Sequence, residues 1–229
     1  MKKRILFLAA SVGLLMGCPD DETTTPQSKT FEITVTNLTV AQPLSPIAIL
    51  SHSADYHLFK VGEAASLAIE KVAESGDNSD LLAEKDSNEQ VKASYSGSGV
   101  ILPGEQDTLT VSISDDDYAL LSVASMLVNT NDAFIGETQL DASQIEVGAS
   151  YSMNMPVWDA GTEANSETAA TIPGPAGGGE GFNAARDDND KITFHAGVVT
   201  SDDGLATSAL TATHRFLNPA ARVTITRTE

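Results

Sequence analysis

Phe31-Glu32-Ile33-Thr34-Val35 alternates apolar and polar residues one by one. A period of two is typical of a β-strand that buries one face in a core and exposes the other to water. The same alternation recurs in four later stretches, residues 109–113, 151–157, 192–194 and 223–225. Residues 119–128 are nearly continuous in apolar side chains, which favours a strand buried on both faces.

Residues 63–74 depart from this pattern, because their apolar side chains recur near helical spacing and stop before Gly76. A second short helix can follow, capped by Asn78 or Ser79. We therefore expect an all-β fold, an antiparallel β-sandwich that carries a small helical insertion and long loops.

The composition narrows the possible partners. The chain has 229 residues with 13 Lys and Arg against 32 Asp and Glu, a net charge of −19. Such an acidic protein is unsuited to nucleic acid, whose phosphates need a basic surface, and to electrostatic docking on anionic lipid. A hydrophobic content of 41% is too high for a disordered acidic chain. The single cysteine excludes an intramolecular disulfide and multi-cysteine metal sites, so a hard cation is the inorganic partner that suits this chain.

The first 18 residues carry an export pattern. A basic start, Met1-Lys2-Lys3-Arg4, precedes an apolar run over residues 5–17 that is too short to span a bilayer. The run ends in Leu15-Met16-Gly17-Cys18, which resembles the lipobox of bacterial lipoproteins. That resemblance implies cleavage before Cys18 and acylation of this cysteine. Ordinary export, with a cysteine near the cleavage site by chance, is the alternative.

The chain accordingly divides into three parts. Residues 1–17 are predicted to be a lipoprotein signal peptide, residues 18–29 a flexible tether, and residues 30–229 one folded domain. Multiple acyl chains at Cys18 would hold the domain at a membrane surface. We expect a lipid-anchored protein of a bacterial cell envelope, on its periplasmic or outer surface.

Most catalytic signatures are missing. The sequence has no G-x-S-x-G motif and no catalytic cysteine, and its glycine-rich residues 173–181 lack the lysine and helix of a phosphate-binding loop. Three acidic clusters, at 115–117, 187–190 and 202–204, fit turns rather than a calcium-loop pattern. The histidines form no metal-binding motif, and we expect each to be satisfied by hydrogen bonds: His52, His57, His195 and His214.

Two other segments place carboxylates where a strand leaves the core, residues 129–136 and 156–163. Asp159 and Glu163 flank a glycine-containing turn, and Asp132 can reach the same centre from a neighbouring loop. Calcium takes six to eight oxygen ligands, which such an arrangement can partly supply. Successive strand side chains face opposite ways, so Trp158 should point into the core when Asp159 faces the loops.

These two segments resemble the spondin domain, which was first described in F-spondin and also occurs in bacterial secreted proteins. The similar residues are 125–136 and 156–163, the second with Trp158-Asp159-Ala160-Gly161-Thr162. Weaker similarity to the bacterial branch of this family lies at residues 43–46, 58–62, 173–179 and 214–219. The whole resemblance then spans about residues 31–227.

The resemblance implies a β-sandwich of C2-like appearance that binds calcium through three acidic side chains in its loops. Carried over by position, these are Asp132, Asp159 and Glu163. Animal members have Asp where this chain has Glu163 and an aromatic residue where it has Ala133.

The resulting interpretation is a non-enzymatic, calcium-binding lipoprotein that serves adhesion or surface interaction with an unidentified protein or glycan. Two alternatives stay open: a hydrolase of envelope polymers, and a module that binds a small ligand without calcium. Adhesion rests only on analogy with animal relatives.

Overall fold

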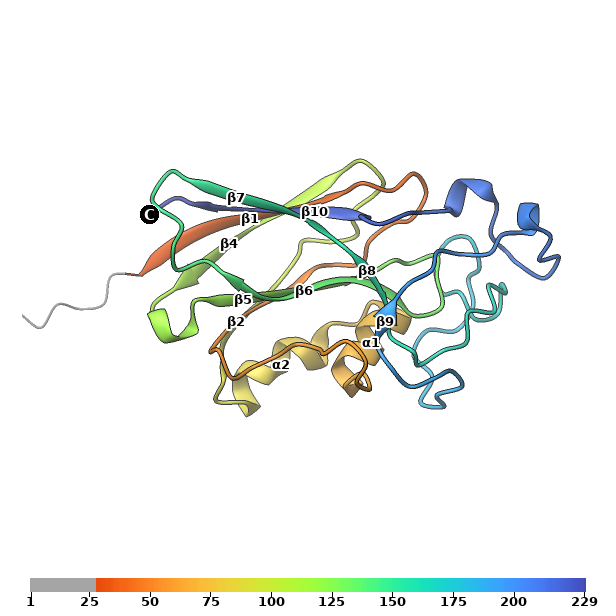
Figure 1. Cartoon of the computed structure of the whole chain (residues 1–229), viewed down its shortest axis with the longest axis horizontal. Helices are drawn as coiled ribbons and strands as arrows, with labels where there is room; N and C mark the ends of the chain where they lie inside the picture. Colours follow the sequence, from red (N-terminus) through yellow and green to blue (C-terminus); the bar gives the residue numbers. More distant parts are fainter. Residues whose placement is uncertain (1–27) are drawn as a thin grey trace, which may run out of the picture.

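Two antiparallel β-sheets pack face to face in the computed structural model, which describes residues 28–229 (Figure 1). The four-stranded sheet has the order β4 (Gln106–Ile113), β1 (Lys29–Asn37), β10 (Ala221–Arg227) and β7 (Ser150–Met155). The six-stranded sheet has the order β3 (Val91–Ser96), β2 (Ala48–His52), β5 (Leu120–Met126), β6 (Ala133–Asp141), β8 (Val157–Asp159) and β9 (Thr193–Phe194). The predicted all-β sandwich is confirmed.

The main core lies between the sheets and follows the predicted alternation. Phe31, Ile33 and Val35 of β1 are fully buried, whereas the side chains between them are more exposed. In register, Ile33 lies between Leu109 of β4 and Ile225 of β10. The alternating residues of three strands therefore form one continuous apolar layer.

A second core lies on the outer face of the six-stranded sheet, under the helical insertion α1 (Leu67–Ser75) and α2 (Ser79–Ser87) (Figure 1). It contains Ile69 of α1, Phe134 of β6 and Trp158 of β8. This second core explains why β5 is buried on both faces, as its apolar run predicts.

The first helix begins later than the sequence pattern suggests. Residues 63–66 precede it, and the Ser66 hydroxyl caps it by accepting a hydrogen bond from the Ile69 amide at 3.2 Å. Gly76 ends it with a φ of 70°, a left-handed conformation that glycine adopts readily. Asn78 occupies the cap position of α2 without a side-chain cap bond.

Pro156 divides a segment whose alternation predicts one strand. Residues before it form β7 in one sheet, and residues after it form β8 in the other. Proline has no amide hydrogen to continue a ladder, which suits a point where the chain changes sheets. Trp158 is buried as predicted, but in the second core rather than between the sheets.

Long loops and short 3₁₀ turns complete the chain. The turns are η1 (Asp116–Tyr118), η2 (Ser201–Asp203) and η3 (Ala212–His214). The glycine-rich residues 173–181 form a loop, as expected. This loop packs closely, because a Cβ atom on Gly174 would lie 2.2 Å from the Val128 carbonyl oxygen.

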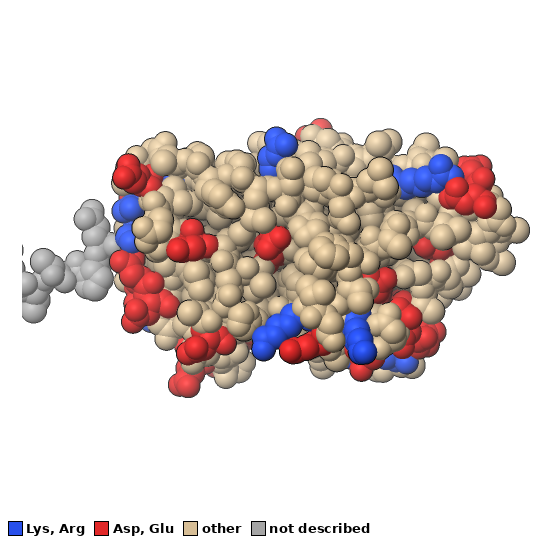
Figure 2. All heavy atoms as spheres, viewed as in Figure 1, with Lys and Arg blue, Asp and Glu red and all other residues tan. Residues whose placement is uncertain are grey.

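Acidic side chains are spread over the face drawn in Figure 2, with few basic ones among them. In residues 28–229, no helix is long and apolar enough to cross a bilayer. The predicted signal peptide, Cys18 and nearly all of the predicted tether lie outside the described residues.

Candidate functional site

The pairing of β6 with β8 brings the two predicted aspartates together. Asp132 immediately precedes β6 and Asp159 ends β8, with Ala133 opposite Asp159 in the register. The Ala160 amide also donates to the Asp132 carbonyl oxygen at 3.2 Å. Glu163 follows after a turn at Gly161, whose φ is 70°. All three predicted residues thus lie in loops at one end of the sandwich. We call the loops that hold Asp132, Asp159 and Glu163 the acidic end.

Asp132 is fully buried and only half satisfied. Its Oδ2 atom accepts hydrogen bonds from the amides of Thr162 at 2.8 Å and Glu163 at 3.1 Å. Its Oδ1 atom is buried and has no hydrogen-bond partner among residues 28–229. Burial, together with the charge of Asp159, raises the pKa of Asp132 to about 7, although the two amide hydrogen bonds act to lower it. An unsatisfied buried acceptor is costly, so this atom marks a place where a partner is needed.

Asp159 is held by its own turn. Its Oδ1 atom accepts from the Gly161 amide at 2.9 Å, and its Oδ2 atom accepts from the Asn165 amide group at 2.7 Å. Only 6% of Asp159 is exposed. Its charge acts on Asp132, Glu167 and His195. Asp159 is therefore the electrostatic centre of the acidic end.

Glu163 is also 6% exposed. Burial raises its pKa to about 8, and the charges of Glu74, Asp132 and Asp187 act in the same direction. A hydrogen bond at 3.2 Å from Asn131 Nδ2 to Glu163 Oε2 acts in the opposite direction and lowers this pKa. Its protonated form is thus favoured at pH 7 while no cation is nearby.

Glu167 also lies in the acidic end, although no pattern in the sequence predicts this. It is 1% exposed and has a φ of 58°, a left-handed conformation unusual for a residue with a side chain. Its Oε1 atom accepts from the Val199 amide at 3.2 Å, whereas its buried Oε2 atom has no hydrogen-bond partner in the described part of the chain. Burial raises the pKa of Glu167 to about 7. The hydrogen bond from Val199 acts to lower this pKa, and the charge of Asp159 raises it further.

Asn131 connects two of these acids. Its Oδ1 atom accepts from the Glu167 amide at 3.1 Å, while its Nδ2 group donates to the Glu163 side chain. Its place beside Asp132 is the only signal that the sequence offers for this role. Asn131 is therefore a positioning residue for the acidic end.

The histidines differ in their surroundings. His52 Nε2 lies 2.7 Å from the Ser122 hydroxyl, and His52 Nδ1 lies 2.8 Å from the Ser53 carbonyl oxygen, as expected for a satisfied histidine. His195 does not fully meet that expectation. Its Nδ1 atom accepts from the Gly197 amide at 3.0 Å, but its buried Nε2 atom has no hydrogen-bond partner from residue 28 onward. Burial lowers the pKa of His195, although the negative charge of Asp159 acts to raise it.

Helix α1 reaches the acidic end through Glu74. Its Oε2 atom accepts from the Asn183 amide at 2.8 Å, and its buried Oε1 atom has no hydrogen-bond partner within the residues that the structure describes. Burial raises the pKa of Glu74 despite this bond. The neighbouring Glu70 pairs with Arg186. The helical insertion is thereby tied to the loop over residues 183–186.

The donors of the acidic end have the right chemistry for calcium, since carboxylate and amide oxygens are its usual ligands. In the part of the chain from residue 28 onward, however, no three His, Cys, Asp or Glu side chains are grouped as a metal site. Asn165 and Asn131 engage one oxygen each of Asp159 and Glu163. A cation would share these carboxylates with the two amides, whereas Asp132 Oδ1 has no hydrogen bond within residues 28–229.

Comparison with known proteins adds one finding. A protein-family model described as Spondin_N matches residues 27–174. That range contains Asp132, Asp159 and Glu163, but not His195. No curated protein sequence matches the chain.

Proposed function

The chain belongs to the spondin N-terminal domain family, and from that premise we propose that it binds calcium through Asp132, Asp159 and Glu163. We further propose that it is a non-enzymatic lipoprotein of a bacterial envelope, anchored through Cys18, that serves adhesion or surface interaction.

One observation carries the calcium proposal, the unpartnered Oδ1 atom of the fully buried Asp132. Nearby, Asp159 adds its negative charge, and no Lys or Arg contributes to the shifted pKa of Asp132. A divalent cation would give this oxygen a ligand partner and remove the repulsion between the two aspartates. Calcium suits the place better than magnesium, because it tolerates irregular oxygen ligation.

Calcium should therefore raise the melting temperature of the domain. A ligand that binds only the folded state stabilises it by about 2.7 kcal/mol at a concentration 100 times its dissociation constant. Differential scanning calorimetry in calcium and in EDTA measures this shift. We expect Asp132→Asn and Asp159→Asn to remove most of it, Glu163→Gln to remove part, and magnesium at equal concentration to give little.

Asp55→Asn is the matched control, because Asp55 is exposed and lies outside the acidic end. It removes the same charge and should keep the full calcium response. Identical melting curves in calcium and in EDTA for the wild-type protein would contradict the proposed site. An equal loss of response in Asp55→Asn would mean that calcium acts only through the net charge.

The anchor makes a separate prediction. Cys18→Ser removes the thiol that would carry lipid, so the protein should move from the detergent phase to the aqueous phase in Triton X-114 partitioning. The wild-type protein should also incorporate radiolabelled palmitate, and the variant should not. A variant that stays in the detergent phase as firmly as the wild type would exclude lipid attachment at Cys18.

The absence of enzymatic activity is part of the proposal. A hydrolase of envelope polymers needs an acid that its substrate can reach, whereas Asp132 is fully buried and Asp159 and Glu163 are each 6% exposed. The raised pKa values of Asp132 and Glu163 fit a cation site and an acid catalyst equally, so the burial of these side chains is what favours the cation site. Release of reducing sugar from envelope polysaccharides by the purified protein would contradict this assignment.

A further inference from the structure

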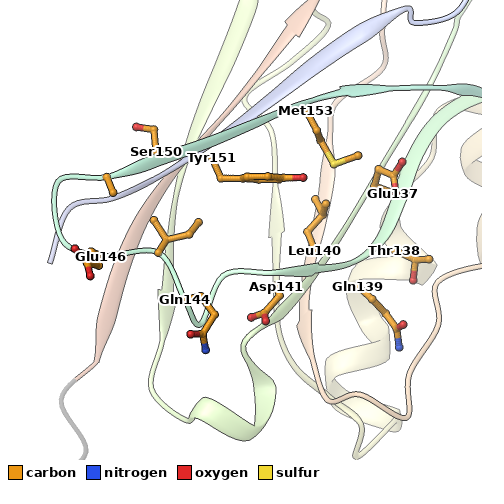
Figure 3. A pocket seen from close by; sticks show the side chains of 12 residues that line it. Glu137, Thr138, Gln139, Leu140, Asp141, Gln144, Glu146, Ser150, Tyr151 and Met153 are labelled. Atoms are coloured by element: carbon orange, nitrogen blue, oxygen red, sulfur yellow. The ribbon is translucent and has the colours of Figure 1, made fainter.

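The sandwich is open along one side, between β6 and β7. β7 is an edge strand of the four-stranded sheet, and β8 covers β6 only at Ala133, Phe134 and Ile135. A groove of about 700 Å³ lies between these strands, lined by residues of β6, β7 and the loop that joins them (Figure 3). We call it the β6–β7 groove. It is far along β6 from the acidic end, because Asp132 precedes this strand and Asp141 ends it.

The β6–β7 groove has an apolar middle. Figure 3 shows Leu140, Tyr151 and Met153 pointing into it. Tyr151, which lines the groove, is 50% exposed. Large apolar side chains that remain this accessible at a concave site are typical of binding surfaces.

The lining of the β6–β7 groove is acidic. It includes Glu137, Asp141 and Glu146, and no Lys or Arg. Figure 3 shows Glu137 and Glu146 toward opposite ends of the groove, with Tyr151 between them. Arg227 approaches the joining loop, but its guanidinium donates to the carbonyl oxygens of Ile145 and Glu229. The charges of the groove thus call for a basic occupant.

The free edge of β7 offers backbone hydrogen bonds. The Arg227 amide donates to the Ala149 carbonyl oxygen at 3.1 Å, so alternate residues of β7 from Ala149 onward pair with β10. The intervening backbone groups, those of Ser150, Ser152 and Asn154, then point away from β10. The hydroxyls of Ser150 and Ser152 lie 2.8 Å from those of Thr226 and Thr224 on β10, so they do not cover this edge.

We propose that the β6–β7 groove binds an extended basic segment of a partner protein, which adds to β7 as a further strand. One apolar side chain of the segment packs among Leu140, Tyr151 and Met153. A Lys or Arg side chain lies two residues to either side of it on the same face, about 7 Å away, and these two basic side chains pair with Glu137 and Glu146.

A second copy of this chain is a poorer occupant. It would present the same acidic groove and a net charge of −19, and like charges across an interface oppose association. The proposal concerns a surface away from the acidic end and does not require that calcium binds there.

The test uses the full chain in detergent and the fluorescein-labelled peptide Thr-Lys-Thr-Val-Thr-Lys-Thr, with binding followed by fluorescence anisotropy. We expect saturable binding, and about tenfold weaker binding to the double variant Glu137→Gln/Glu146→Gln because two charge pairs are lost. The control Glu89→Gln/Glu105→Gln removes two exposed carboxylates elsewhere and should bind within about twofold of wild type.

Strand addition is tested separately. Ser152→Pro removes a backbone donor at the free edge of β7 and should abolish binding while circular dichroism shows a folded domain. A peptide with N-methyl groups at alternate residues removes the matching donors of the probe without altering the protein, and it too should not bind.

Three results would overturn the proposal. If peptide binding weakened equally in the control double variant, the interaction would depend on net charge and not on the groove. Unchanged binding of the N-methylated peptide would exclude strand addition. A dimer seen by analytical ultracentrifugation and lost in Ser152→Pro would assign the edge to a second copy of the chain.

Discussion

In calcium-free buffer, the free energy of unfolding should fall as the pH rises from 6.5 to 8. Burial raises the pKa of Asp132 to about 7 from its ordinary 3.8, and those of Glu163 and Glu167 to about 8 and 7 from 4.5. Between the unfolded and folded values, the folded state binds more protons than the unfolded state. Stability contributed by these three groups is then lost as the pH rises through their folded pKa values.

The size of this loss should be several kcal/mol, because one pKa unit corresponds to about 1.4 kcal/mol. Burial lowers the pKa of His52 and His195 from 6.5, which makes stability rise with pH below that value. This histidine contribution fades above pH 6.5, so the carboxyl groups dominate the range from pH 6.5 to 8. Urea denaturation in EDTA at several pH values across this range measures the effect.

Calcium should reverse the trend, since it binds the deprotonated carboxylates and its stabilisation grows as they lose protons. Asp132→Asn should make the pH dependence in EDTA less steep, because it removes one of the three titrating groups, while the control Asp55→Asn should follow the wild type. A wild-type stability that is constant or rises from pH 6.5 to 8 without calcium would contradict the buried carboxyl groups as described. So would an Asp132→Asn curve parallel to the wild type.

Trp158→Ala should destabilise the domain by about 3–5 kcal/mol, as loss of a buried aromatic side chain does. Trp158 is 7% exposed, and its ring lies 5.4 Å from Phe59 and 4.3 Å from Phe194 between centroids. Its indole Nε1–H also donates to the Gly136 carbonyl oxygen at 2.9 Å. The alanine variant leaves a cavity in the second core and removes this hydrogen bond.

Urea denaturation at fixed calcium concentration measures the loss. Trp158→Phe keeps most of the packing and should cost less than the alanine variant. Leu217→Ala is the control, because Leu217 is 86% exposed and its loss should change stability by about 0.5 kcal/mol or less. A loss below about 1 kcal/mol for Trp158→Ala would mean that the second core does not depend on this residue.

The acidic end could be predicted in part. Asp132, Asp159 and Glu163 stand out because they follow apolar strands, and the structure brings them to one end of the sandwich. Glu167 and His195 could not be predicted as members. Glu167 lies in a loop without periodicity, and it is buried only because segments near Val199 and Asn131 fold over it.

The sequence by itself determined the fold class, since a period of two reports that one face of a strand is buried. It also determined the acidic character of the protein and the short helical insertion. Periodicity does not say which strand will be the neighbour, because pairing depends on residues far apart in the chain. Only the tertiary structure decided that the chain changes sheets at Pro156, that Trp158 enters the second core, and that β6 and β7 leave a groove between them.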